Sequence, residues 1–178
     1  MYRFSMAVSP EIKLSLLQIQ DSAALFALVD ANRDHLRQWL PWVDANETEK
    51  SSEEFIQFVL GQFSRNAGFG AGIFYNNKLC GIAGFHNINH SNKMAIMGYW
   101  LAKDFEGKGI MSQSVSYLTA YAFKTWNLNR LEIRCATDNI KSQAIPERLG
   151  FTCEGISRQC EIVNGRVLDH KVYAKLRG

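Results

Sequence analysis

Two glycines at the junction between an apolar segment and a long helical pattern constrain this chain most. Residues 98–101 read Gly-Tyr-Trp-Leu, and after a short charged loop residues 106–114 read Glu-Gly-Lys-Gly-Ile-Met-Ser-Gln-Ser. Glycines at such a junction allow several backbone N–H groups to converge at a helix N-terminus, where the helix dipole favours an anion. The sequence therefore predicts a phosphate-bearing ligand held by main chain rather than by basic side chains.

The composition narrows the class of protein. With 178 residues and 47% apolar content, the chain is expected to form one compact domain over residues 1–178. No apolar run approaches the roughly 20 residues of a membrane span, and residues 1–4 lack the apolar segment of a signal peptide. The formal net charge is only +3, and the sequence contains no run of five like charges. Both observations disfavour direct nucleic-acid binding. We expect a cytoplasmic protein with no membrane partner.

Cysteine and histidine usage indicates neither a disulfide framework nor a metal site. The four cysteines lack a CxxC pair and lie in apolar, strand-like segments, so they are expected to be reduced core thiols. They are Cys80, Cys135, Cys153 and Cys160. His86 and His90 lie four residues apart, but in a polar strand connection that does not suit a metal pair. We expect no metal.

The hydrophobic periodicity predicts a layered α/β domain. Helical patterns cover 22–31, 33–42, the segment that follows the acidic start at 51–54, 110–126 and 139–150. Strand patterns cover 12–17, 71–75, 79–87, 93–101, 131–137, 151–163 and 166–176, the last two joined by a type I′ turn at Asn164-Gly165. These elements make a mixed sheet of six or seven strands, in which the helices after residues 101 and 138 are crossovers.

Other phosphate-binding loops fit the glycine turn less well. A Walker loop needs a serine or threonine after its lysine, whereas Lys108 is followed by Gly109. A dinucleotide-binding turn needs a third glycine where this chain has Ser112. A turn that binds no ligand remains open at this point.

A set of motifs occurs in a distinctive order along the chain. After strand, glycine turn, helix and strand come Asn139-x-x-Ser142, then Pro-Glu-Arg-Leu-Gly-Phe at 146–151 and Glu-Gly at 154–155, with Trp-Leu-Pro-Trp earlier at 39–42. This order resembles the GNAT superfamily of N-acetyltransferases and, more narrowly, its RimJ/RimL subfamily. The segments at 109–114 and 161–165 resemble the serine-directed RimL type more than the alanine-directed RimJ type.

The resemblance implies a fold, a reaction and partners. The fold would be a mixed, mostly antiparallel sheet of six or seven strands, flanked by helices on both faces. The reaction would be direct transfer of an acetyl group from acetyl-CoA to an N-terminal α-amine, with no covalent acyl-enzyme. A ribosomal protein with an N-terminal serine would be the acceptor, the positive balance would suit an acidic acceptor, and the enzyme would be a homodimer.

Two departures from the family pattern affect the site. The superfamily turn usually has arginine or glutamine at its first outer position, where this chain has Glu106, and a small residue where it has Met111. Since Glu106 cannot donate to phosphate, the N–H groups of residues 108–111 would carry more of the anion. Many relatives place a tyrosine acid where this chain has Pro146, which moves attention to Ser142.

The resemblance also assigns roles to individual residues. Glu161 would take the proton of the amine, and Ser142 would donate a hydrogen bond to the departing thiolate. Each has a plainer alternative: Glu161 as an exposed strand carboxylate, and Ser142 as a first-turn serine that bonds local backbone. The N-terminal α-amine, with a reference pKa of about 7.7–8.0 against about 10.4 for lysine, is the acceptor that a weak base could deprotonate.

The expected acetyl-CoA site is larger. Asn139 would fix the pantetheine amides or simply cap its helix, and Arg148, like Lys141, would meet phosphates or lie in solvent. Backbone at 100–101 would donate to the developing oxyanion where that strand splays from its neighbour. The full set is Trp100, Leu101, Glu106, Gly107, Lys108, Gly109, Ile110, Met111, Ser112, Asn139, Ser142 and Arg148. Trp39 and Trp42 would line the acceptor groove or anchor helix packing.

Two alternative functions stay open on the sequence alone. The same fold could acetylate a small amine such as a polyamine, an amino sugar or a drug. A non-catalytic acyl-CoA sensor would keep the cofactor site without needing Ser142 or Glu161.

Overall fold

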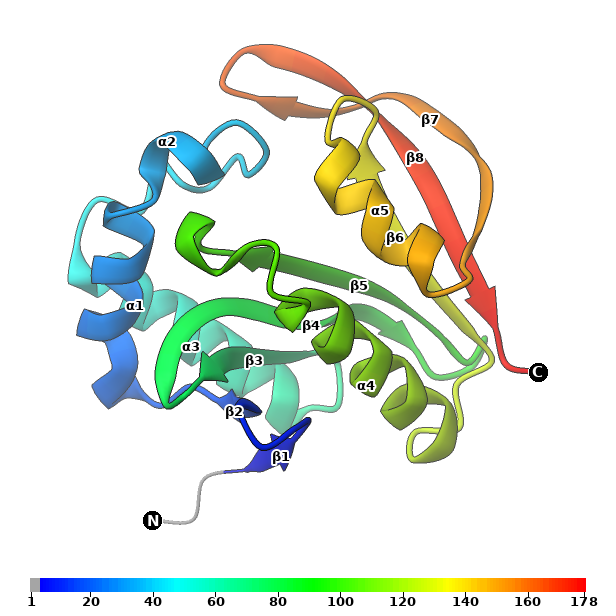
Figure 1. The fold of residues 1–178 in the computed structure, drawn as a ribbon, viewed down its shortest axis with the longest axis horizontal. Helices are drawn as coiled ribbons and strands as arrows, with labels where there is room; N and C mark the ends of the chain where they lie inside the picture. The colour runs from blue at the N-terminus through cyan, green and yellow to red at the C-terminus, as the bar shows by residue number, and fades with distance from the viewer. Residues whose placement is uncertain (1–3) are drawn as a thin grey trace.

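The computed structural model describes residues 4–178, which form one eight-stranded sheet with helices packed against it (Figure 1). The strand order is β1-β2-β3-β4-β5-β6-β8-β7, and every neighbouring pair is antiparallel except β5 and β6. The strands are β1 (Ser5–Ala7), β2 (Ile12–Leu16), β3 (Phe69–Tyr75), β4 (Lys78–Asn89), β5 (Met94–Leu101), β6 (Arg130–Ala136), β7 (Thr152–Val163) and β8 (Arg166–Leu176). The helices are η1 (Ile19–Asp21), α1 (Ser22–Asp30), α2 (Arg33–Leu36), α3 (Glu49–Ser64), η2 (Lys103–Phe105), α4 (Ile110–Lys124) and α5 (Ile140–Arg148).

The predicted fold class is confirmed, with one strand more than expected. The additional strand is β1, whose three residues pair with β2 at the sheet edge. A segment this short is below the length at which alternation of apolar and polar residues becomes a signal. The expectation about a signal peptide concerns residues 1–4, of which 1–3 lie outside the described residues.

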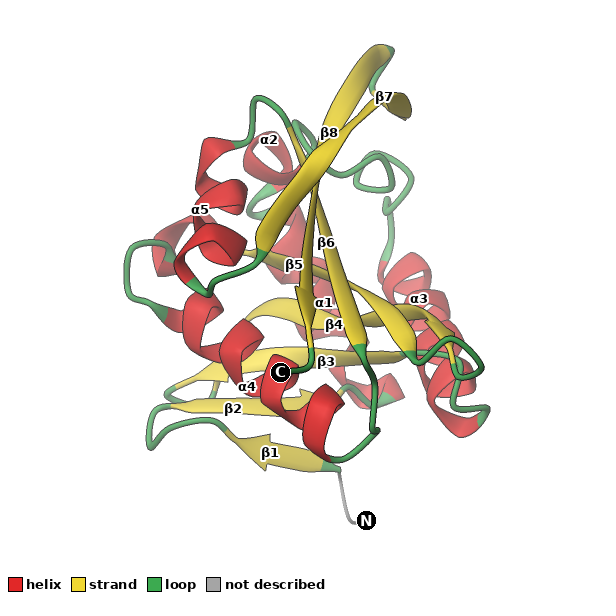
Figure 2. Cartoon of the chain, turned by 90° about the vertical axis from the view of Figure 1, so that its right-hand side faces the viewer, coloured by secondary structure: helices red, strands yellow, loops and turns green. Residues whose placement is uncertain are grey.

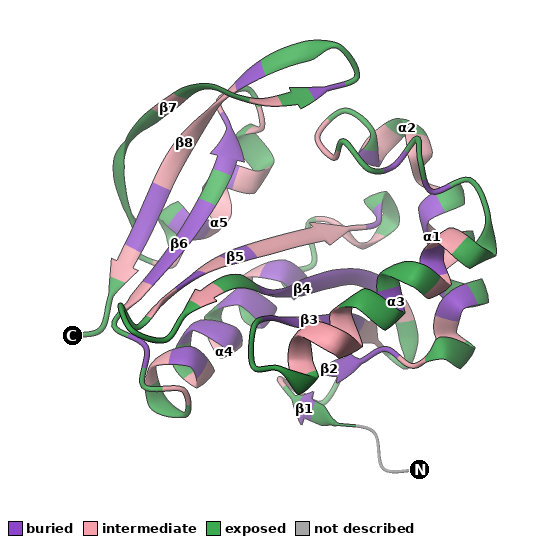
Figure 3. Cartoon of the chain, turned by 180° about the vertical axis from the view of Figure 1, so that it is seen from behind, coloured by how far each residue is buried: buried purple, intermediate pink, exposed green. Residues whose placement is uncertain are grey.

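Helices cover both faces of the sheet (Figure 2). One face packs against α4 through a core that includes Phe85, Met97 and Leu118. The other face packs against α1 and α3 through a second core that includes Val29 and Ile56. The burial pattern in Figure 3 agrees, because buried residues follow β3, β4 and β6 while most of β7 is exposed. Within residues 4–178, no helix combines the length and apolarity that crossing a bilayer requires.

The parallel pair β5 and β6 separates partway along its length. The strands pair over only four positions, from Met94 opposite Arg130 to Met97 opposite Ile133. Beyond this point Gly98–Leu101 pair with β4 alone, and the end of β6 pairs with β8 alone. The two strands diverge visibly in Figure 1. This splay, expected at 100–101, opens the sheet between α4 and α5.

The helices differ from their predicted bounds by one or two residues at most of their ends, and two of the differences have a local cause. The helix predicted at 33–42 is only the single turn α2, and residues 37–39 continue as turns toward Pro41, which lacks an N–H and disfavours helical geometry at the residue before it. The helix α3 begins at Glu49, two residues before the predicted start, because Thr48 is its N-cap and accepts from the Ser51 N–H. The sequence therefore indicated both helices but misplaced their ends.

The C-terminal hairpin carries a bulge beside its predicted turn. Asn164 and Gly165 have φ of 50° and 76°, as a type I′ turn requires. Farther along, Ser157 pairs with His170 and Glu161 with Leu168, so residues 158–160 lie opposite Asp169 alone. The Asp169 carboxylate accepts from the Gln159 N–H over 2.7 Å and holds this bulge. A bulge changes the direction in which the following side chains point, here Glu161.

The prediction of four core thiols is half wrong. Cys80 and Cys135 are buried, at 0% and 4% exposure. Cys153 and Cys160 are exposed, because β7 is an edge strand whose outer face no helix covers. All four are free thiols.

Candidate active site

A cleft of about 1500 Å³ occupies the gap between β5 and β6. Its walls come from the N-terminal ends of α4 and α5 on one side and from residues 35–40 and the C-terminal hairpin on the other. The cleft is lined by twelve of the thirteen predicted site residues: Trp100, Leu101, Glu106, Gly107, Gly109, Ile110, Met111, Ser112, Asn139, Ser142, Arg148 and Glu161. The exception is the Lys108 side chain, whose ammonium lies 5.1 Å from the ring centre of Phe105, outside the cleft.

The glycine turn presents unpaired backbone donors to this cleft. Gly107 and Gly109 have φ of 75° and 72°, a conformation that side-chain-bearing residues rarely adopt. The first bond within α4 runs from the Gln113 N–H to the Gly109 carbonyl over 3.0 Å. Within residues 4–178, the N–H groups of residues 108–112 have no protein acceptor. Because these donors lie at a helix N-terminus, the residues present fit a diphosphate.

Polar contacts link α2, α4 and α5 at this end of the cleft. The Glu106 carboxylate lies 2.5 Å from the Lys141 ammonium on α5 and 3.4 Å from His35 Nε2 on α2. Arg148 donates to the Ser112 hydroxyl over 2.7 Å and so links α5 to α4. Lys141, whose side chain is 77% exposed, and Arg148 therefore have protein partners at the cleft while both contacts remain open to solvent.

Ser142 lines the cleft from the first turn of α5 and is half-buried. Asn139 caps that turn, since its side-chain oxygen accepts from the Ser142 N–H over 3.1 Å. The Ser142 hydroxyl oxygen lies 3.2 Å from the Cys135 sulfur and 3.5 Å from the Tyr99 hydroxyl. Burial, more than the nearby Cys135, raises the pKa of Tyr99 well above its usual value, so this hydroxyl stays protonated.

Sequence reasoning missed Tyr99 as a site residue. Tyr99 belongs to the motif at 98–101. The family pattern, however, has its tyrosine acid at the position of Pro146 on α5, and no tyrosine on β5 was considered. Alternation along β5 is the signal that could have found it, because it directs Tyr99 and Trp100 to opposite faces of the sheet.

Glu161 lines the other wall of the cleft together with a histidine that sequence reasoning also missed. Glu161 Oε2 lies 3.2 Å from Nε2 of His170, whose side chain is 13% exposed. The bulge in β7 brings Glu161 to this position. His86 and Arg134 line the same wall. His86 faces the cleft, and partial desolvation, followed by the charge of Arg134, lowers its pKa.

The two tryptophans differ in their neighbours, and neither of the roles left open for them is decided by these contacts. Trp39 lines the cleft and also packs against the small core of Ala136, Val163 and Leu168. Trp42 does not line the cleft and instead stacks at an angle on Trp100, with ring centres 6.1 Å apart. His90 bonds the Asn66 carbonyl, and residues 4–178 contain no group of three or more side chains arranged to hold a metal ion.

The splayed strands, the amide-lined helix terminus and the buried hydroxyl define an acyl-CoA-dependent transferase. The model of the acetyltransferase (GNAT) domain matches residues 11–152, and the chain belongs to this family. It is therefore an acetyl-CoA-dependent N-acetyltransferase. The relatives described next are named as enzymes, so the hypothesis of a non-catalytic acyl-CoA sensor finds no support among them.

Three relatives illustrate the likeness. The ribosomal-protein-serine acetyltransferase of Escherichia coli (strain K12) is 30% identical over 169 residues, covering 95% of this chain and 94% of that protein. The structure of RimL, a ribosomal L7/L12 alpha-N-protein acetyltransferase with coenzyme A bound in a disulfide to a cysteine, has a TM-score of 0.94 at 32% identity and covers 97% and 98%. The microcin C7 self-immunity acetyltransferase MccE, solved with acetyl-CoA and AMP, has a TM-score of 0.93 at 30% identity and covers 96% and 94%.

Proposed function

We propose that this enzyme acetylates the N-terminal α-amine of a ribosomal protein, with serine as the first residue. The observation that carries the proposal is near full-length similarity to a ribosomal-protein-serine acetyltransferase and to RimL. The cleft supports it with a carboxylate, Glu161, on the wall opposite Ser142.

The basicity of the acceptor agrees with such a base. Taking a proton from an α-amine near pH 7 costs on the order of 1.4 kcal/mol, against about 4.6 kcal/mol for a lysine side chain. Glu161 is 35% exposed, and a carboxylate this accessible to water is an adequate base only for the α-amine. In the proposed reaction Glu161 accepts the amine proton, and backbone near 100–101 stabilises the oxyanion.

Ser142 and Cys135 have different parts in this reaction. The Ser142 hydroxyl donates to the sulfur that leaves. Burial raises the pKa of the Cys135 thiol, and its hydroxyl neighbours are Ser142 and Tyr99 rather than an imidazole. A thiol without a base is a poor nucleophile, which favours direct transfer over an acyl-enzyme.

The decisive experiment separates binding from turnover. The enzyme is incubated with acetyl-CoA and peptides that carry different N-terminal residues, and products are read by mass. We expect acetylation at the α-amine of seryl peptides, and Ser142→Ala and Glu161→Gln are expected to lose turnover while binding acetyl-CoA with unchanged Kd. Preferential acetylation of lysine side chains would contradict the proposal.

A small amine is the second candidate acceptor. The favouring observation is the MccE structure, similar along nearly the full chain and solved with a nucleotide beside acetyl-CoA. Polyamines, amino sugars and aminoacyl nucleotides belong in the same mass-based assay. A higher kcat/KM for any of them than for the best seryl peptide would favour this second function.

We further propose that the enzyme works in the cytoplasm as a single-domain homodimer. Light scattering on the purified protein tests the dimer, and a mass of about 20 kDa, the monomer value, would contradict it.

A further inference from the structure

Arg134 lies where the sheet begins to open. It follows Ile133, the last residue of β6 that pairs with β5. On its other side Arg134 pairs with Val172 of β8. Its side chain lines the cleft on the wall that also holds Glu161 and His170. Val172 and His170 lie two residues apart on β8, so Arg134 shares one face of the sheet with His170, the neighbour of the proposed base. Arg134 has no role so far.

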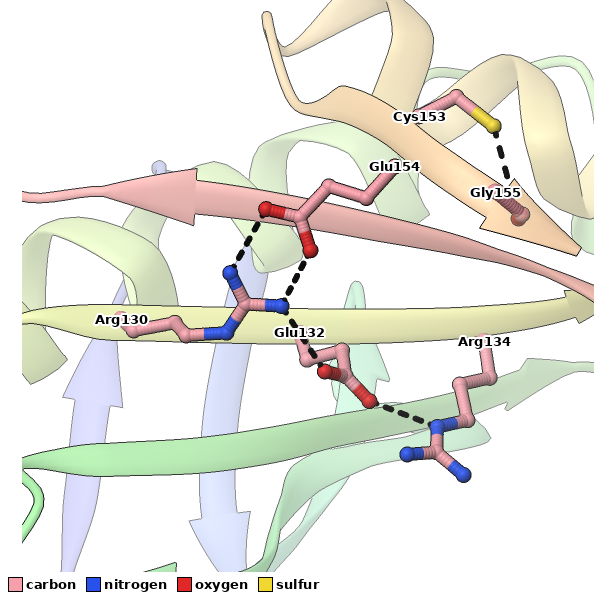
Figure 4. A network of polar contacts seen from close by, with 6 residues as sticks. All are labelled: Arg130, Glu132, Arg134, Cys153, Glu154 and Gly155. Carbon is pink, nitrogen blue, oxygen red and sulfur yellow. Dashed lines mark hydrogen bonds and ion pairs between the residues drawn. The ribbon is translucent and has the colours of Figure 1, made fainter. Parts of the chain in front are cut away.

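A buried carboxylate holds this arginine (Figure 4). Arg134 Nε donates to Glu132 Oε1 over 2.6 Å, and the Glu132 side chain is 7% exposed. The other Glu132 oxygen accepts from Arg130 over 3.1 Å. Arg130 in turn donates to both oxygens of Glu154, over 2.8 and 2.5 Å. The guanidinium of Arg134 is thus fixed through Nε by a network whose other members bind one another.

The terminal nitrogens of Arg134 remain available to a ligand. Figure 4 shows them directed away from Glu132. Within residues 4–178 they have no hydrogen-bond or ion-pair partner, and the side chain is 46% exposed. A guanidinium presents its donors in a planar fork that suits carbonyl and carboxylate oxygens. Stability alone does not explain the burial of Glu132, because buried ion pairs rarely stabilise a fold more than apolar residues do.

Arg134 stays charged at every working pH, unlike the histidines that line this part of the cleft. The pKa of His86 is lowered, so His86 is uncharged near neutral pH. Glu161 lies 3.2 Å from His170, and the other carboxylates that line the cleft, Glu106 and Asp138, pair with Lys141 and Arg166. An acceptor ammonium that approaches Glu161 therefore meets a forked donor on the same wall.

We propose that Arg134 binds the carbonyl oxygen next to the acceptor amine and so selects α-amino acyl compounds over plain alkyl amines. Glu132 is its positioning residue. This inference deepens the proposed function and depends on it. In an α-amino acyl group the carbonyl oxygen lies about 3 Å from the amine nitrogen, because only two carbons separate the two atoms. Lysine side chains and polyamines have no oxygen there, so they gain nothing from Arg134.

The test compares acceptors with and without that carbonyl. The three acceptors are a seryl tetrapeptide amide, serinamide and ethanolamine, which is serinamide without its carboxamide. Arg134→Met is expected to lower kcat/KM for both carbonyl-bearing acceptors by roughly 10- to 100-fold, the range for a hydrogen bond to a charged group, mainly through KM. The acetyl-CoA Kd, and the rate or inhibition constant of ethanolamine, are expected to stay within about twofold.

Three further variants separate recognition from folding and charge. Glu132→Gln keeps the side-chain volume, and we expect it to raise the peptide KM but to add nothing in the Arg134→Met background. Arg134→Lys keeps the charge without the fork and is expected to recover only part of the loss. Arg65→Met removes an exposed cation away from the cleft and controls for net charge.

The possible failures are distinguishable. A wild-type enzyme that acetylates no seryl peptide overturns the proposed function. A wild-type enzyme that acetylates peptides, with Arg134→Met losing nothing or losing equally on ethanolamine, overturns this inference alone. A stronger effect on serinamide than on the tetrapeptide would indicate a small aminoacyl acceptor as the source of the same chemistry.

Discussion

The Tyr99 hydroxyl donates a hydrogen bond to the main-chain oxygen of Ser142 over 3.0 Å and so joins β5 to the first turn of α5. This bond spans the region in which β5 and β6 have ceased to pair. It therefore fixes the position of Ser142 where β5 and β6 are no longer hydrogen-bonded to each other.

The first prediction follows from this bond. Tyr99→Phe removes only the hydroxyl and is expected to lower the free energy of unfolding by about 1 kcal/mol, the usual net value of one hydrogen bond. Because Ser142 is then less well fixed, kcat should fall about fivefold, against about 100-fold for Ser142→Ala, typical of a lost proton donor. Steady-state kinetics on both variants and on the double variant measure the coupling. If Tyr99→Phe costs the same factor without Ser142, the two residues act independently.

The sequence predicted best where local chemistry decides the structure. The glycines at 107 and 109, the Asn139 cap and the Asn164-Gly165 turn each depend on a backbone conformation that few residues accept. Twelve of the thirteen site residues that the glycine turn and the family resemblance predicted line one cleft, and their roles remain predictions. Lys108 was predicted for its main chain, and its side chain, being free to turn, packs on Phe105 instead.

What the sequence did not reveal depends on contacts between distant segments. Tyr99 meets Ser142 across 43 residues, and Glu161 meets His170 only because a bulge shifts the register between them. The exposure of Cys153 and Cys160 depends on which strand ends the sheet, and apolar neighbours along the chain carry no information on that. Inter-element geometry of this kind leaves little trace in local periodicity.

The second prediction concerns the left-handed glycine that caps α4. Gly109→Ala forces a side chain into φ of 72° and should destabilise the fold by about 1 kcal/mol. It should also weaken acetyl-CoA binding at least tenfold, because any relaxation of this residue turns the amides of 108–112 away from one another. Gly165→Ala, at φ of 76° in the hairpin turn, is the matched control. Calorimetry should show similar stability losses in both variants but a changed acetyl-CoA Kd in only the first.

The third prediction concerns the charge of Glu106. Its carboxylate sits beside the amide donors and holds the Lys141 ammonium at 2.5 Å. Glu106→Gln removes a negative charge near the proposed diphosphate and frees Lys141 to approach it, so the CoA Kd should fall about fivefold, or roughly 1 kcal/mol. The gain should shrink at high salt. Asp104→Asn neutralises an exposed acid outside the cleft and should leave Kd unchanged; an equal gain there would point to net charge instead.

The last prediction uses the four thiols as probes of the cleft. Burial raises the pKa of Cys80 to about 12 and also raises that of Cys135, so at pH 8 both are almost wholly in the unreactive thiol form. Iodoacetamide should therefore modify Cys153 and Cys160 first at pH 8. The same raised pKa values stabilise the folded state below the ordinary thiol pKa of about 8.5, and this stability is lost as the pH rises through the pKa of the folded state.

Raising the pH extends the same measurement. Modification of the two buried thiols, Cys80 and Cys135, should increase as the pH rises toward their raised pKa values. Because Cys135 lies 3.2 Å from the Ser142 hydroxyl, CoA in the cleft should protect Cys135 and leave Cys153 unprotected. Peptide mapping by mass reads all four sites in one digest. Protection of Cys153 by CoA, with Cys135 modified at an unchanged rate, would place the cofactor outside the gap between β5 and β6.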